Sequence, residues 1–223
     1  MSDLLGEQKR YYAERAPEYD DWWFRRGRYG LEPEALARWQ QDIAEVETAL
    51  DVFAPRGCVL ELAAGTGIWT RKLVRLADRV VAVDANAETL ALNTFDAELV
   101  QADVFDWRPE EPVDVVFFSF WLSHVPPARF DPFWAMVRAA LRPGGRAFFI
   151  DSLPEPTSTA KDHGPIDESG VSRRKLNDGR EFNIVKVFYQ PSVLERRLAE
   201  LGWSGWVRST NKFFLYGLMT ARK

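Results

Sequence analysis

Residues 59–70, VLELAAGTGIWT, join a carboxylate to a run of small residues. Glu61 lies near the end of an apolar stretch, and Ala63, Gly65 and Gly67 follow it before residues with helical spacing begin. This order predicts a β-strand, a tight turn and the start of a helix. Small residues let a ligand approach the backbone closely, and the first N–H groups of a helix are free to bind an anion. A carboxylate at this place would repel a phosphate but would attract a ligand that carries a positively charged amine.

S-adenosylmethionine has such an amine, a carboxylate that can face the start of the helix, and no phosphate. The stretch VLELAAGTG resembles the first motif of class I S-adenosylmethionine-dependent methyltransferases, E/D-x-G-x-G-x-G, with Ala63 in place of the first glycine. The resemblance implies that Glu61, Ala63, Gly65 and Gly67 belong to the cofactor site. The competing interpretation is an ordinary strand-to-helix turn of a doubly wound sheet. The G-x-G-x-x-G spacing of dinucleotide sites is absent.

A second acidic residue, Asp84, ends the next apolar run, 23 residues after Glu61. That gap fits one helix and one strand, and a carboxylate there can accept hydrogen bonds from both hydroxyls of a ribose. In the family, an acid after the third strand accepts from the adenine amino group and an apolar neighbour covers the ring. The resemblance assigns these roles to Asp103 and Val104, although a turn aspartate is the alternative for Asp103.

Two further residues at the ends of predicted strands complete the predicted cofactor site. Ala85 directly follows Asp84, and Ser119 lies at the end of the continuous apolar run 112–121, a pattern typical of a central strand that is buried on both faces.

The N-terminal residues 1–32 are predicted to form a helical lid. An amphipathic helix broken at Pro17 would carry Tyr12 and Tyr19, and the segment resembles the aromatic lid of small-molecule methyltransferases. The alternative is that these tyrosines only pack on the sheet. The next segment, RRGRYG at 25–30, is either a solvated charged surface or the mouth of an anion site.

The alternation of predicted strands and helices along the chain predicts one α/β domain over residues 1–223, with a Rossmann-like sheet of seven strands. By resemblance to the family, the strand order is 3-2-1-4-5-7-6 with the last strand antiparallel. We expect helices over 33–54, 68–77, 127–142 and 192–201, and a turn at LRPGG. Residues 152–189, a loop and a β-hairpin around Asn177-Asp178-Gly179, are inserted after the fifth strand and are expected to form the acceptor side.

The predicted hairpin, residues 171–186, carries a local charge of +3 in a chain whose net charge is −4. Strand alternation places Lys186 on the same side as Phe182, Ile184 and Phe188. Since a lysine on an apolar face is costly unless its ammonium is paired, Lys186 either reaches solvent or faces a pocket that holds an anion. Arg174 could share that side on the partner strand.

The motifs FWLSHVP and RRKLNDGREFNIVKVF resemble phosphonate O-methyltransferases of dehydrophos biosynthesis and their relatives, over most of the chain. The resemblance implies that Arg174, Lys186 and Tyr29 bind the anionic oxygens of the methyl acceptor, and it implies a role in secondary metabolism. The RRGRY segment is longer and more basic than in that family. His124 is predicted to lie near the methyl group, as a base, an anion ligand or a capping residue.

The amino-acid composition limits the kinds of partner and ligand that the protein is expected to bind. The acidic net charge argues against nucleic acid and anionic membranes, and one cysteine with two histidines predicts neither disulfides nor a metal site. The absence of a long apolar run and of a signal peptide predicts a cytoplasmic protein, either a monomer or a homodimer. The predicted partner is a small anionic metabolite. The alternatives are N-, C- or phenol O-methylation of a natural product, or a protein that binds the cofactor without catalysis.

Overall fold

The computed structural model describes residues 2–160 and 162–222. Seven strands form one sheet in the order β3-β2-β1-β4-β5-β9-β8, which is the predicted order when the two hairpin strands β6 and β7 are set aside. The strands of this sheet are β1 (Cys58–Leu62), β2 (Arg79–Asp84), β3 (Glu98–Gln101), β4 (Val113–Ser119), β5 (Leu141–Ser152), β8 (Trp203–Ser209) and β9 (Phe214–Ala221). Strand β9 runs antiparallel to both of its neighbours.

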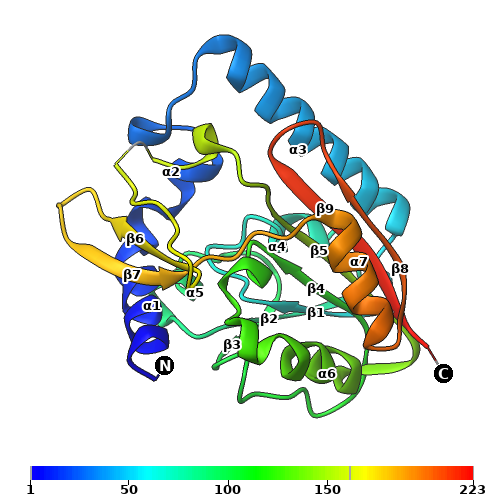
Figure 1. The fold of residues 1–223 in the computed structure, drawn as a ribbon. Helices are drawn as coiled ribbons and strands as arrows, with labels where there is room; N and C mark the ends of the chain where they lie inside the picture. The colour runs from blue at the N-terminus through cyan, green and yellow to red at the C-terminus, as the bar shows by residue number, and fades with distance from the viewer. Residues whose placement is uncertain (1, 161, 223) are drawn as a thin grey trace.

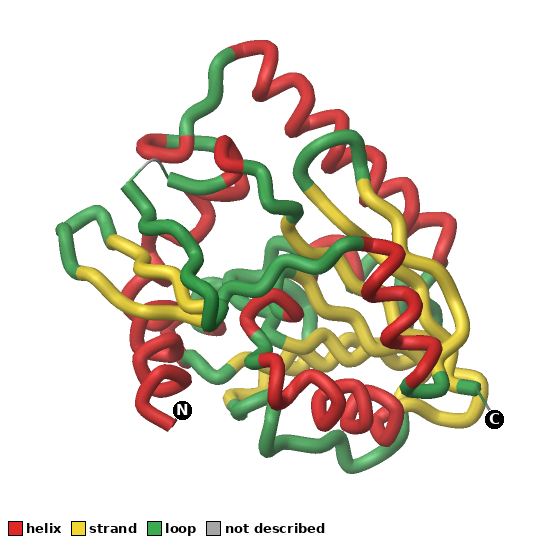
Figure 2. The backbone as a smooth tube through the Cα atoms, viewed as in Figure 1, coloured by secondary structure: helices red, strands yellow, loops and turns green. Residues whose placement is uncertain are grey.

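Helices cover both faces of the sheet (Figure 1, Figure 2). The α-helices are α1 (Ser2–Arg15), α2 (Tyr19–Trp23), α3 (Pro33–Phe53), α4 (Thr70–Leu73), α5 (Ala87–Leu90), α6 (Phe130–Ala140) and α7 (Pro191–Glu200). Short 3₁₀ turns are η1 (Ala16–Glu18), η2 (Gly27–Tyr29), η3 (Leu122–His124), η4 (Pro127–Arg129) and η5 (Pro156–Ser158).

The alternation of apolar residues along β4 explains the two layers. Val116 and Phe118 face one core, which α6 and α7 cover. Val115 and Phe117 face the other core, which α3, α4 and the end of α2 cover. Because both faces are covered, β4 is apolar throughout its central part, as a buried parallel strand requires.

The hairpin consists of β6 (Val171–Lys175) and β7 (Glu181–Val185), outside the main sheet. Its register pairs Arg174 with Phe182, which places Arg174 on the side predicted from alternation. Tyr11 of α1 packs against Leu176 and Ile184 of the hairpin. Figure 1 shows α1 and the hairpin side by side at one end of the molecule. The predicted break at Pro17 is confirmed, because α1 ends at Arg15 and η1 follows.

The extents predicted for two helices and for one turn are wrong. The helix expected over 68–77 is α-helical only from Thr70 to Leu73, because three-residue turn bonds such as Leu76 N–H to Leu73 O alternate with helical ones. The expected turn at LRPGG lies within β5, where residues 141–146 pair with 113–115 and the excess residues form a bulge. The helix before it is correspondingly shorter, Phe130–Ala140 instead of 127–142.

Candidate active site

Two adjoining cavities open at the carboxyl ends of the parallel strands, where ligands of such sheets bind. One lies over the ends of β1, β2 and β4, and the other lies between loop 152–166, the hairpin and the N-terminal segment. Four side chains line both cavities: Tyr12, Tyr19, Phe120 and His124. We call them the shared wall.

The turn after β1 forms the floor of the first cavity. Ala63, Gly65 and Gly67 all have positive φ, +53°, +57° and +88°, which explains why small residues or glycines are needed here. A Cβ added at Gly65 would meet no atom within 4 Å, so the backbone faces open space there. Its N–H donates to Oδ2 of Asp84 at 2.9 Å, which joins the turn to the end of β2.

The carboxylate of Asp84 lines the cavity and is held in place by its neighbours. Besides Gly65, the N–H of Asn86 (2.9 Å) and the hydroxyl of Thr89 (3.2 Å) donate to it. Burial raises the pKa of Asp84, while these hydrogen bonds act in the opposite direction. A carboxylate oxygen accepts more than one hydrogen bond, so a fixed acceptor with spare capacity fits a ribose diol.

The part of the first cavity around Asp103 is lined by apolar residues, Leu5, Val104, Phe105 and Trp121, together with polar ones. Ala85, Val104 and Ser119 line it as predicted positions, and Asp103 receives hydrogen bonds from the N–H of Phe105 (2.9 Å) and from Lys9 of α1. An apolar slot with one carboxylate at its edge fits an adenine ring. These features therefore fit the cofactor that the sequence predicts.

Glu61 and Gly67 line neither cavity. Glu61 is buried beneath the turn, where Thr70 donates to it at 2.6 Å and Asn93 donates to Thr70 at 2.8 Å. Burial raises the pKa of Glu61 to about 8. A Cβ at Gly67 would lie 2.5 Å from Oδ1 of Asn93, so Gly67 permits this packing. Their part in cofactor binding stays a prediction.

Within the shared wall, His124 and Tyr12 form a hydrogen-bonded pair. Nδ1 of His124 lies 2.7 Å from the carbonyl of Val185, which can only accept, so the proton is on Nδ1. Nε2 then accepts from the hydroxyl of Tyr12 at 2.9 Å. Burial, with a contribution from Lys186, holds the pKa of His124 well below its usual value. His124 is thus neutral, with both ring nitrogens engaged.

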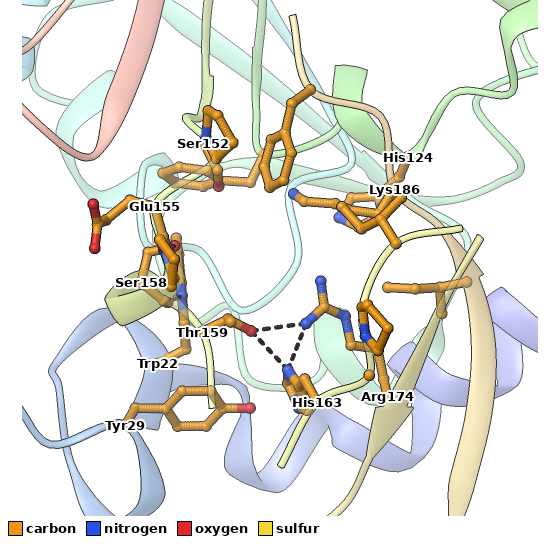
Figure 3. A pocket seen from close by; sticks show the side chains of 18 of the residues that line it. Trp22, Tyr29, His124, Ser152, Glu155, Ser158, Thr159, His163, Arg174 and Lys186 are labelled. Carbon is orange, nitrogen blue, oxygen red and sulfur yellow. Dashed lines mark hydrogen bonds between the residues drawn. The ribbon is translucent and has the colours of Figure 1, made fainter. Parts of the chain in front are cut away.

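Two buried cations from the hairpin segment face the second cavity (Figure 3). The ammonium of Lys186 donates to the hydroxyl of Ser123 at 2.8 Å and lies 3.9 Å from Oδ1 of Asp151. Burial lowers the pKa of Lys186 to about 8, and Asp151 opposes this effect. One guanidinium nitrogen of Arg174 donates to Thr159 (2.7 Å) and to Nδ1 of His163 (2.6 Å).

Tyr29 also lines the second cavity, but Arg25, Arg26 and Arg28 of the same segment do not. Arg25 donates to the carbonyls of Thr157 and Ser158, and Arg28 pairs with Asp162 at 2.6 Å. Two arginines of this segment therefore tie it to the segment around Thr157, Ser158 and Asp162 instead of lying free in solvent. Its role as the mouth of an anion site stays a prediction.

The sequence reasoning missed four residues of the site. Arg15 and the pair Thr159–His163 line the second cavity, and Phe120 belongs to the shared wall with a φ of +52° that is rare for an aromatic residue. The position of Phe120 directly after the apolar β4 was an available signal. No local pattern distinguishes Arg15 from the many charges around it.

Comparison with known proteins agrees with this geometry. Residues 59–145 match the family described as "Methyltransferase domain". Two solved structures are 39% and 40% identical to the chain, with TM-scores of 0.79 and 0.78. The first match covers 100% of this chain and 98% of the other, and the second covers 97% of both. The chain therefore belongs to the class I S-adenosylmethionine-dependent methyltransferases and is an enzyme that uses this cofactor.

Within the class, both of these structures are of DhpI, one described as a DhpI–SAH complex and one as a DhpI–SAM–HEP complex. A 1,6-didemethyltoxoflavin N1-methyltransferase from Burkholderia thailandensis, 16% identical with a TM-score of 0.64 over 100% of this chain and 90% of that one, shares the fold. A comparison with curated protein sequences finds no match.

Two properties of the described residues concern other kinds of site. Among residues 2–160 and 162–222, no group of three or more histidine, cysteine, aspartate or glutamate side chains could hold a metal ion. No helix in that part of the chain is both long enough and apolar enough to cross a membrane.

Proposed function

We propose that this enzyme transfers the methyl group to an oxygen of a small anionic metabolite, a phosphonate or a carboxylate. The observation that carries the proposal is the pair of buried cations, Arg174 and Lys186, which face a cavity that shares a wall with the cofactor cavity (Figure 3). Buried charges are costly unless an opposite charge meets them, so the cavity favours an anion. The resemblance of the sequence to phosphonate O-methyltransferases supports the same class of acceptor.

The arrangement suits a nucleophile that is already ionised. The cofactor supplies a methyl group activated by its sulfonium sulfur. Arg174 and Lys186 would hold the anion while one of its oxygens stays free, and the side chains of the shared wall lie where the two cavities adjoin. Catalysis then depends on positioning, for which effective molarities can reach on the order of 10⁵ M.

The geometry of His124 gives little support to acceptors that must lose a proton. A general base needs a free lone pair within reach of the proton it removes. Nε2 of His124 already accepts from Tyr12, and burial holds its pKa low. N-, C- and phenol O-methylation are therefore less well supported than methylation of an ionised oxygen. We assign His124 a positioning role for Tyr12 and for the end of the hairpin.

The test is a methyl-transfer screen with labelled cofactor against matched phosphonates, carboxylates, phenols and amines. We expect label in phosphonate or carboxylate esters. Label only in phenols or amines would overturn the proposal.

A further inference from the structure

The second cavity contains a third buried cation, Arg15, contributed by the last residue of α1. Its residue exposure is 8%, the same as that of Arg174. Its Nη2 donates to the hydroxyl of Tyr29 at 3.2 Å, and its guanidinium lies over the rings of Tyr11 and Tyr19. Its Nε is buried with no hydrogen-bond partner among the described residues. Arg15 is thus a cation held by neutral groups.

The charges around this cavity do not balance. Lys186 has Asp151 at 3.9 Å, and Asp151 is itself fixed by the N–H groups of Ser123 and Ser152. Among residues 2–160 and 162–222, neither Arg15 nor Arg174 has a carboxylate within 4.0 Å. Two positive charges therefore remain unmatched.

The other groups that face the cavity do not supply the missing negative charge. Burial raises the pKa values of Tyr12 and Tyr19, which line the cavity, and of Tyr11, whose ring contacts Arg15, so these phenols are neutral. Burial and Arg174 lower the pKa of His163 to about 2, so it is neutral as well.

The charged groups at the edge of the cavity are already paired. Glu155 lies at the rim and accepts from Thr157 (3.0 Å), with Lys212 at 3.6 Å. Arg28, over the ring of Tyr29, pairs with Asp162.

We propose that Arg15 binds the acceptor together with Arg174 and Lys186, and that the two unmatched charges make the cavity select an acceptor that carries two negative charges on one group. This inference rests on the proposed function and deepens it, because a fully ionised phosphonate carries two charges and a carboxylate carries one.

The chemistry is consistent with this selection. An acceptor oxygen forms a bond to the methyl carbon as the carbon–sulfur bond breaks, and the electron pair of that bond stays on sulfur. The acceptor changes from a dianion to the monoanion of its methyl ester, the sulfonium charge disappears, and no proton moves. The ester leaves one cation unmatched, so it binds more weakly than the acceptor and a second methylation is disfavoured.

The experiment compares two probes that differ by one charge. Binding of ethylphosphonate and of its monomethyl ester is measured by calorimetry in the presence of S-adenosylhomocysteine, for the wild type and for Arg15→Gln, Arg15→Lys and Arg180→Gln. Arg180 is the control because it is an arginine that contacts the end of α1, through Glu14 at 3.0 Å, but lines neither cavity. The ratio of the two affinities is compared within each protein, so a partly unfolded variant does not distort it.

We expect the wild type to bind ethylphosphonate about 10- to 100-fold more tightly than the ester, as expected for a hydrogen bond between charged groups. Arg15→Gln should reduce this ratio to within about threefold of unity, whereas Arg15→Lys and Arg180→Gln should keep most of it. The affinity of the wild type for ethylphosphonate should also fall as the pH drops below the second pKa of this probe. For difluoromethylphosphonate, whose fluorines lower that pKa, the same fall in affinity should occur at a lower pH.

The outcomes separate the two proposals. Equal binding of both probes by the wild type, or an unchanged ratio in Arg15→Gln, would overturn the role of Arg15 while methyl transfer to ethylphosphonate keeps the proposed function intact. Neither binding nor methyl transfer for any phosphonate or carboxylate would remove the proposed function itself.

Discussion

The two cavities of this enzyme are built in different ways. The first cavity, proposed above for the cofactor and called the cofactor cavity below, is formed mainly by short segments at the ends of strands, where backbone groups and one carboxylate set the geometry. The second cavity, proposed above for the acceptor and called the acceptor cavity below, is lined by long side chains from α1, η2, β6 and the residues after β7, far apart in the sequence. The first depends on a turn that only small residues permit, and the second depends on the placement of charge. Substitutions should therefore separate the two functions.

The largest expected effect is charge reversal at Lys186. Lys186→Glu replaces a buried cation next to Asp151 with a second carboxylate, which repels both Asp151 and the acceptor. We expect kcat/KM for the acceptor to fall by about 10³-fold or more, with the affinity for S-adenosylhomocysteine within about threefold of the wild type. Labelled methyl transfer and calorimetry measure the two quantities. Lys175→Glu, on the hairpin but outside both cavities, is the control. Unchanged turnover would show that the acceptor does not depend on this ammonium.

The substitution Asp84→Asn should impair the binding of the cofactor and leave the binding of the acceptor largely intact. It removes the negative charge that accepts from Gly65 and Asn86, so the affinity for the cofactor should fall about 10- to 100-fold. The KM for the acceptor at saturating cofactor should change little. Calorimetry with S-adenosylhomocysteine measures the loss, and the exposed Asp78→Asn is the control. If the KM for the acceptor rises as much as the affinity for the cofactor falls, the two cavities do not bind their ligands independently.

The pH dependence should come from the acceptor cavity. Burial lowers the pKa of Lys186 to about 8, so the free enzyme loses this cation as pH rises through 8. We expect kcat/KM for the acceptor to fall about tenfold per pH unit above that value, because kcat/KM reports the free enzyme. In kcat the limb should lie at higher pH, since a bound anion stabilises the ammonium. Lys186→Arg should remove the limb below pH 10. A limb that persists in this variant would belong to another group.

The smallest expected effect is a change in stability on substituting Ala63 in the turn after β1. Ala63 has a φ of +53°, which costs a residue with a Cβ roughly 1–2 kcal/mol, and glycine recovers part of this cost. Ala63→Gly should raise the free energy of unfolding by up to about 1 kcal/mol and Tm by a few degrees, as a melting curve can show. A decrease in stability would mean that packing of the Ala63 methyl group outweighs the backbone strain.

The contrast between the cavities also explains what could be predicted from the sequence. The first strands and the positions of Asp84 and Gly65 follow from local patterns, because an apolar run that ends in an acid or a small residue is visible in a short window. The order of the strands in the sheet came from the resemblance to the family. The hairpin and the direction of Lys186 follow from the turn residues and from alternation. Arg15 and His163 could not be found in this way, since their place depends on how α1 and loop 152–166 pack on the hairpin. The bulge in β5 was missed because Pro and Gly at 143–145 indicate a turn whether or not the strand continues.

Helix α1 takes part in both cavities, since Lys9 pairs with Asp103 at one of them and Arg15 lines the other. If two ligands both contact the same helix, the conformational entropy lost in ordering that helix is lost only once for the two binding events. The ligand that binds first loses free energy to the ordering of α1, and the second ligand binds to a helix that is already ordered. Thermodynamic reciprocity then requires each ligand to increase the affinity of the other by the same factor. We expect this enzyme to show cooperative binding of cofactor and acceptor even though the two ligands occupy separate cavities.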